Sequence, residues 1–206
     1  RTCDKTVVVL MALLLIMGLI TLFSATYYQK SATGDALAAV KKQLIGVALG
    51  AAACVVLSRV PYRFFRRPKV TLLLLAISAL LLILVIIPGI GVSINGSRRW
   101  LNIGGLSMQP SEFAKYAMVI FMAGALDRRS EALGSLFAGV APLLLIPGVM
   151  FLLILEQPNL STGGSILICA LVMLFAAGLK KRHMALLGVS GFCLGAFYAW
   201  SAPYRR

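Results

Sequence analysis

The sequence predicts an all-α, polytopic helical membrane protein with about seven membrane-spanning helices. Hydrophobic residues make up 60% of the chain and the mean hydropathy is +0.95, both far above the values typical of soluble domains. The runs 7–22 and 72–87 are nearly free of charge, and about 20 apolar residues are enough for a helix to cross the hydrocarbon layer. The alternating pattern of a membrane β-barrel is absent.

Each expected span is a long apolar run between charged or turn-forming residues. Gly46-x3-Gly50 in the second span and Gly191-x3-Gly195 in the seventh have a spacing that lets helices pack closely, and internal packing is favoured over a dimer interface. Pro88-Gly89 is expected to end the third span. The approximate spans are 6–26, 43–58, 70–92, 111–126, 135–155, 162–179 and 184–201.

Local signals support the later spans. Glu112 falls in the first turn of the fourth, where the helix dipole favours a carboxylate. Pro142 and Pro147 are expected to kink the fifth. Asn159 or Ser161 is expected to cap the sixth, with Ser161 favoured for that role. Together the spans predict one transmembrane domain over residues 1–206.

Basic residues predict the orientation in the membrane. The loop 59–69 is the densest basic cluster, and the positive-inside rule places it in the cytoplasm. Alternation then places the N-terminus inside and the loop 94–110 outside. The net charge of +14 is spread in short clusters at the ends of apolar runs, so no nucleic-acid partner is expected. The cluster comprises Arg59, Arg63, Arg66, Arg67 and Lys69.

The ends of the chain and its cysteines carry further information. No cleavable signal peptide is recognised, and the start at Arg1 and the end at Arg206 just after a span predict a truncated portion of a larger protein. The four cysteines lack metal-ligand or CxxC spacing and are expected to be packing residues.

The richest polar stretch lies between the third and fourth spans, where Arg98 and Arg99 precede Trp100. An indole prefers the headgroup level, and a guanidinium can hold phosphate with two parallel hydrogen bonds. Both arginines could instead reach outward to anionic lipid. Composition alone slightly favours this second interpretation.

Lys115 stands about one turn inside the fourth span, where an unpaired ammonium costs a few kcal/mol or more. Glu112, three residues earlier, lies on the same helix face and could pair with it. Two interpretations have equal weight: an ion pair that only stabilises the helix start, or a positive, water-lined cavity opening to the outer face.

A second polar segment, Glu156–Thr162, follows the fifth span on the same predicted side. Its polar groups could converge with the Arg98–Lys115 region at the rim of one cavity. His183, in a basic turn, is expected to be solvated. No nucleophile–base pair, phosphate-binding loop or metal-ligand cluster is recognised, so no metal is expected in this chain.

Asn95-Gly96-Ser97-Arg98-Arg99-Trp100, followed by Gln109-Pro110-Ser111-Glu112-x-x-Lys115, resembles the signature of the SEDS family, the FtsW/RodA/SpoVE group. Similarities extend over the whole chain, including Phe23-Ser24-Ala25, Lys42-Gln43 and Pro203-Tyr204-Arg205-Arg206. Pro88-Gly89-Ile90-Gly91 and the Ser-Arg-Arg-Trp form resemble the division and sporulation branch more than the elongation branch.

The resemblance implies a ten-span bacterial plasma-membrane fold and a peptidoglycan glycosyltransferase that polymerises lipid II. It implies a class B penicillin-binding protein as partner, within divisome or sporulation membrane assemblies, and leaves room for a divalent cation in the intact enzyme. The family's catalytic aspartate is expected beyond Arg206, so this portion should be inactive alone. The substrate-binding residues that we predict are Arg98, Arg99, Gln109, Glu112, Lys115, Gln157 and Asn159.

One departure from the family pattern stands at Asn159, where the family usually has aspartate in Gln-Pro-Asp-Leu-Gly-Thr. The lost carboxylate argues against a charge role at this position. Two other functions therefore stay open: a flippase or transporter for lipid-linked precursors, and a non-catalytic membrane scaffold that holds the transpeptidase.

Overall fold

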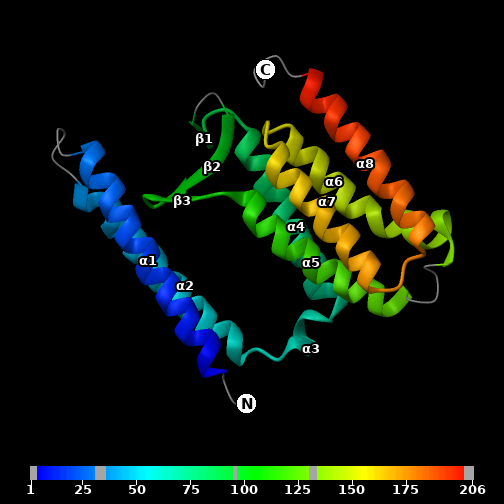
Figure 1. Cartoon of the computed structure of the whole chain (residues 1–206), viewed down its shortest axis with the longest axis horizontal. Coiled ribbons are helices and arrows are strands. Elements are labelled where there is room, and N and C mark those ends of the chain that lie inside the picture. The colour runs from blue at the N-terminus through cyan, green and yellow to red at the C-terminus, as the bar shows by residue number, and fades with distance from the viewer. Residues whose placement is uncertain (1–3, 31–35, 95–96, 130–133, 202–206) are drawn as a thin grey trace. The chain divides into compact units, whose positions relative to one another are not determined.

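The computed structural model describes residues 4–30, 36–94, 97–129 and 134–201 (Figure 1). Contacts between Cα atoms divide the chain into two compact units, residues 1–60 and 61–206. A helix occupies each of the seven predicted spans, which confirms the all-α, polytopic prediction. The single transmembrane domain stays a prediction.

The first unit is a helical hairpin of α1 (Lys5–Lys30) and α2 (Ala36–Arg59), which lie side by side in Figure 1. Most of its described side chains are exposed apolar groups, as lipid-facing helices require. The hydroxyls of Thr21 and Thr26 donate to the carbonyls of Met17 and Leu22 at 3.0 and 2.6 Å. These polar groups are therefore satisfied within the helix.

The second unit holds the remaining helices and a small sheet. The helices are α3 (Tyr62–Phe65), α4 (Pro68–Ile86), α5 (Pro110–Arg129), α6 (Ala141–Leu155), α7 (Leu160–Ala176) and α8 (Lys181–Ser201), and the π-helical segment η2 (Leu136–Val140) leads into α6. The strands are β1 (Gly91–Ile94), β2 (Ser97–Ile103) and β3 (Leu106–Met108).

The core of this unit lies where α4, α5, α6 and α7 pack together (Figure 1). Leu82, Met118, Ile154 and Ile166 are fully buried there. Gly163 allows α6 and α7 to approach closely, since a Cβ at this position would lie 2.9 Å from Cδ2 of Phe151.

Four helices among the described residues are long and apolar enough to cross a membrane: Lys5–Tyr27, Ala39–Arg59, Pro68–Ile86 and Leu136–Leu155. Leu160–Ala176 is a shorter apolar helix. The chain is therefore a multi-pass membrane protein. Pro147 lies inside α6 and Pro142 in its first turn, directly after η2.

The sheet was not predicted and shortens the third span, because α4 ends at Ile86 rather than near residue 92. Its order is β1-β2-β3 and both pairs are antiparallel, with Ser93 opposite Arg98. Gly104 and Gly105 form the β2–β3 turn with φ of 61° and 86°, which glycine adopts without strain. The carboxamide of Asn102 accepts from the Gly105 N–H at 3.0 Å.

Gly91 joins α4 to β1, and replacing it with alanine is expected to destabilise this junction. A Cβ at Gly91 would overlap the carbonyl oxygen of Val85 and lie 2.9 Å from its carbonyl carbon, and no side-chain rotation relieves a clash with backbone. We expect a loss of about 3 kcal/mol or more, measured by thermal unfolding in detergent. Gly148→Ala is the matched control because a Cβ there meets nothing within 4 Å. Equal melting temperatures for the two variants would contradict the prediction.

Candidate functional site

The turn between α6 and α7, residues 156–159, is the centre of the candidate site. Gln157 is only 1% exposed, and its Nε2 donates to the carbonyl of Leu82 in α4 at 3.1 Å. The Oε1 atom of Gln157 is buried without a hydrogen-bond partner among the described residues. Gln157, predicted to bind substrate, is thus placed as an anchor of the turn against α4.

Arg99 ties the sheet to the same turn. Its Nε donates to the carbonyl of Gln157 at 3.1 Å, and its Nη2 donates to the carbonyl of Pro158 and, at 3.3 Å, to the hydroxyl of Ser97. The side chain is half-buried. A fixed guanidinium fork suits two adjacent carbonyls well, so Arg99 forms a clamp between β2 and the α6–α7 turn.

A polar cavity of about 270 Å³ lies beside this clamp. Arg98 of β2 and Glu156 of the turn both line it and are both exposed. The expected approach of the two polar segments is therefore confirmed for Arg98 and Glu156. The lining does not include Lys115. The lining residues are Ile86, Ser93, Arg98, Glu156 and Pro158.

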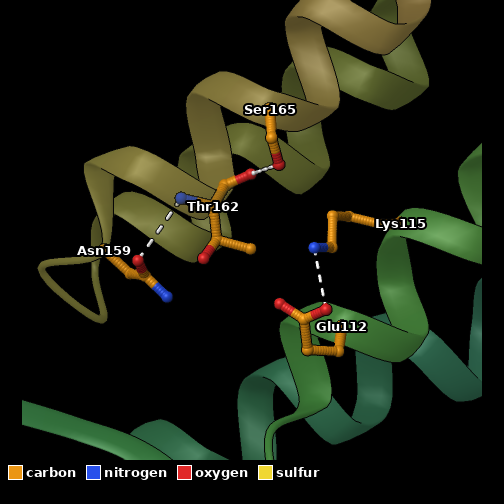
Figure 2. A network of polar contacts seen from close by, with 5 residues as sticks. All are labelled: Glu112, Lys115, Asn159, Thr162 and Ser165. Atoms are coloured by element: carbon orange, nitrogen blue, oxygen red, sulfur yellow. Dashed lines mark hydrogen bonds and ion pairs between the residues drawn. The ribbon is translucent and has the colours of Figure 1, made fainter. Parts of the chain in front are cut away.

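The second polar group lies between α5 and α7. Nζ of Lys115 is 2.8 Å from Oε2 of Glu112, and the two side chains are 29% and 50% exposed. Figure 2 shows the ammonium pointing toward the part of α7 that carries Thr162 and Ser165. Lys115 therefore faces polar groups as well as its predicted ion-pair partner. The interhelical polar cluster, as we call it, consists of Glu112, Lys115, Asn159, Thr162 and Ser165.

Asn159 caps α7, since its Oδ1 accepts from the N–H of Thr162 at 3.4 Å. The prediction that favoured Ser161 as the cap is wrong, because Ser161 is an exposed residue of the first helical turn. An amide oxygen caps a helix as well as a carboxylate does. The asparagine therefore keeps the capping role that an aspartate would have here.

The remaining predicted residue, Gln109, is half-buried just before α5, and its carbonyl accepts from the N–H of Glu112 at 3.1 Å. The neighbouring Ser111 is fully buried, and its hydroxyl has no partner among the described residues. Both residues lie at the N-terminus of the helix that carries Lys115.

Thr162 was predicted only as the last residue of the polar segment Glu156–Thr162, and Ser165 was not predicted. The Ser165 hydroxyl donates to the Thr162 carbonyl at 2.7 Å, and both side chains lie on the face of α7 that meets α5 (Figure 2). A signal was available: Asn159, Thr162 and Ser165 recur every third residue and therefore share one face of an apolar helix.

No group of three or more histidine, cysteine, aspartate or glutamate side chains that could hold a metal occurs in the described ranges. His183 was expected to be solvated but is half-buried. Its Nδ1 is buried and has no hydrogen-bond partner among the described residues. His183 is partly covered because it shares a face of α8 with Leu187, which packs against the core.

Comparison with known proteins gives a consistent result. The family model FTSW_RODA_SPOVE, described as "Cell cycle protein", matches residues 4–206. The chain is 37% identical over 203 residues to stage V sporulation protein E of Bacillus subtilis, covering 98% of this chain and 55% of that protein. It is 35% identical to the probable peptidoglycan glycosyltransferase FtsW of Saccharophagus degradans, covering 100% of this chain and 53% of that protein. The chain thus spans about half the length of the curated relatives it matches.

Solved structures show the same fold. The rod shape determining protein RodA of Thermus thermophilus superposes with a TM-score of 0.58 at 28% identity, covering 86% of this chain and 58% of that one. A chain from a peptidoglycan synthase complex, whose title names coordination of polymerization and crosslinking, gives a TM-score of 0.61 at 27% identity. The match covers 92% of this chain and 56% of that one. With a family model that matches nearly every residue, the chain belongs to the FtsW/RodA/SpoVE family.

Proposed function

We propose that the complete protein is a peptidoglycan glycosyltransferase that polymerises lipid II at the outer face of the bacterial plasma membrane, in division or sporulation. The support is the family membership and the names of the relatives, which include a sporulation protein and probable peptidoglycan glycosyltransferases. In the proposed topology, the N-terminus and residues 59–69 are cytoplasmic and the sheet is extracytoplasmic.

The observation that carries the proposal is the position of Lys115. Its ammonium is half-buried between α5 and α7 and points toward the polar face of α7 (Figure 2). A cation is costly at such a depth and is typically kept for a ligand or an ion pathway. A diphosphate bound here would compete for the ammonium with Glu112, which is half-exposed.

The remaining residues act around that cation. Arg98 is exposed in the polar cavity and could hold a second phosphate oxygen. Gln109 and Glu112 set the start of α5, and Asn159 orders the first turn of α7. Arg99 and Gln157 contribute by fixing the turn between them.

In the proposed reaction, the hydroxyl of an acceptor sugar attacks the anomeric carbon of the donor, and undecaprenyl diphosphate leaves with the electrons of the broken C–O bond. A general base must take the hydroxyl proton. The cationic groups stabilise the negative charge that develops on the leaving diphosphate. The family resemblance implies an aspartate as this base.

A class B penicillin-binding protein is the partner that we propose, together with other division or sporulation membrane proteins. The support is the structural likeness to a chain of a synthase complex whose title joins polymerization to crosslinking. The test of partnership is co-purification of the complete protein with the transpeptidase from membranes.

The activity is tested with purified complete protein in liposomes that contain fluorescent lipid II, with glycan length read on a gel and lipid translocation followed in parallel. Glycan polymer is the expected product. Translocation without polymer would replace the proposal with the flippase function. Transpeptidase binding without either activity would replace it with the scaffold function.

A further inference from the structure

The segment 61–69, which we call the basic elbow, comprises α3 and the start of α4 and carries aromatic and basic side chains together. Tyr62 is 70% exposed and Phe64 is exposed beside it. Arg67 lies over the ring of Phe64, with its guanidinium carbon 5.7 Å from the ring centroid. Arg63 and Lys69 are exposed as well. Such a mixture is typical of the headgroup level of a membrane.

The backbone of the basic elbow is fixed by Thr71. Its hydroxyl lies 3.0 Å from the carbonyl oxygen of Phe65 and 3.2 Å from that of Arg67, and the residue is only 2% exposed. The N–H of Arg67 also donates to the carbonyl of Phe64 at 3.3 Å. The basic side chains therefore project from an ordered backbone.

A cavity of about 340 Å³ lies between the basic elbow and α5. On the α5 side, Ala123 and Gly124 are small and apolar, so their side chains leave space in the cavity. The space is wide enough for a segment of an alkyl chain. The other lining residues are Tyr62, Phe65, Arg66, Ile120 and Asp127.

Positive charge exceeds negative charge on the basic elbow beside this cavity. Arg63 and Arg67 do not line the cavity, but each directly follows a residue that does, Tyr62 and Arg66. Arg66 pairs with Asp127 at 2.5 Å, and the guanidinium of Arg128 lies beside Gly124, where its Nη1 would be 3.4 Å from an added Cβ. In the part of the chain that the structure describes, Arg63 and Arg67 form no salt bridge. An anion can therefore bind these two arginines without displacing a carboxylate.

We infer that the basic elbow and its cavity bind one anionic phospholipid, with the phosphate on Arg63 and Arg67 and part of an acyl chain against Ala123. Charge complementarity points to an anion, and the apolar cavity next to an apolar span points to a lipid rather than an acidic peptide. The inference uses the proposed topology, which exposes this end of α4 to the inner leaflet. It does not depend on glycosyltransferase activity.

The charge part of the inference is tested by native mass spectrometry of the full chain in detergent, titrated with dioleoylphosphatidylglycerol or dioleoylphosphatidylcholine. The unmodified chain is expected to bind the first phosphatidylglycerol more tightly than phosphatidylcholine. Arg63→Gln/Arg67→Gln should reduce that preference roughly fivefold for each charge removed. Lys181→Gln/Arg182→Gln removes two exposed charges at the start of α8 and is the matched control, expected to keep the preference.

The cavity part is tested with Ala123→Leu, which fills the space without changing charge. It should weaken the binding of both lipids about threefold or more, since the chain loses apolar contact, while the ratio between the lipids stays the same. Ala76→Leu, at an exposed position of α4 outside the cavity, should change neither the affinity for the two lipids nor the ratio between them.

The inference is overturned if the elbow pair and the α8 pair lower the preference equally, because the effect would then be general to surface charge. It is also overturned if Ala123→Leu binds both lipids normally, or if the unmodified chain shows no preference for the anionic lipid.

Discussion

Lys115→Ala is expected to reduce glycan polymerisation by the complete protein about a hundredfold or more, because it removes the half-buried cation proposed to stabilise the leaving diphosphate. Stability should change little. The ion pair with Glu112 is partly exposed, and such pairs contribute at most about 1 kcal/mol. The measurement is the initial rate of polymer formation from lipid II beside thermal unfolding of each variant.

Three further variants make the Lys115 prediction specific. Lys115→Arg keeps the charge and should retain part of the rate. Glu112→Gln removes the ion pair but leaves the ammonium in place. It should therefore lower the rate less than Lys115→Ala does. Tyr116→Ala changes the adjacent, exposed position of α5 and should leave the rate unchanged. A normal rate in Lys115→Ala, or an equal loss in Tyr116→Ala, would remove Lys115 from the site.

The helices were predictable because burial in lipid imposes one strong rule, a long apolar run with satisfied backbone. The runs 7–22 and 72–87 met that rule: the first lies in α1, and the second lies in α4 except for its last residue. The sheet was not predictable in the same way. Its strands are short and carry polar residues such as Ser93 and Arg98, and its register depends on the Gly104–Gly105 turn and on contact with α4.

The same division applies to the candidate site. The Glu112–Lys115 pair was predictable because its partners are three residues apart on one helix. The contacts of Arg99 were not, since the carbonyl that accepts from its Nε lies 58 residues away. Gln157 likewise meets a carbonyl 75 residues earlier. Sequence identified both residues as polar groups near the outer surface, but their contacts arise only when the bundle brings α4, the turn and β2 together.

Arg99→Ala is expected to release the sheet from the α6–α7 turn and thereby to abolish polymerisation. The variant loses hydrogen bonds to the carbonyls of Gln157 and Pro158. Charge-assisted bonds of this kind contribute on the order of 2 kcal/mol, so amide hydrogens of β1 and β2 should exchange roughly thirtyfold faster. Hydrogen exchange measured without substrate detects this change independently of activity.

Arg99→Lys and Arg98→Ala then distinguish a clamp from a phosphate ligand. Lysine keeps the charge but lacks the planar fork. If Arg99 acts through the turn, Arg99→Lys should exchange its β1 and β2 amide hydrogens almost as fast as Arg99→Ala does. If Arg99 binds phosphate directly, Arg99→Lys should keep much of the activity. Arg98→Ala, at the neighbouring exposed position, should lower activity while leaving exchange unchanged. Unchanged exchange in Arg99→Ala would mean that the clamp does not hold the sheet, and a direct contact between Arg99 and the diphosphate would then be the better explanation of any lost activity.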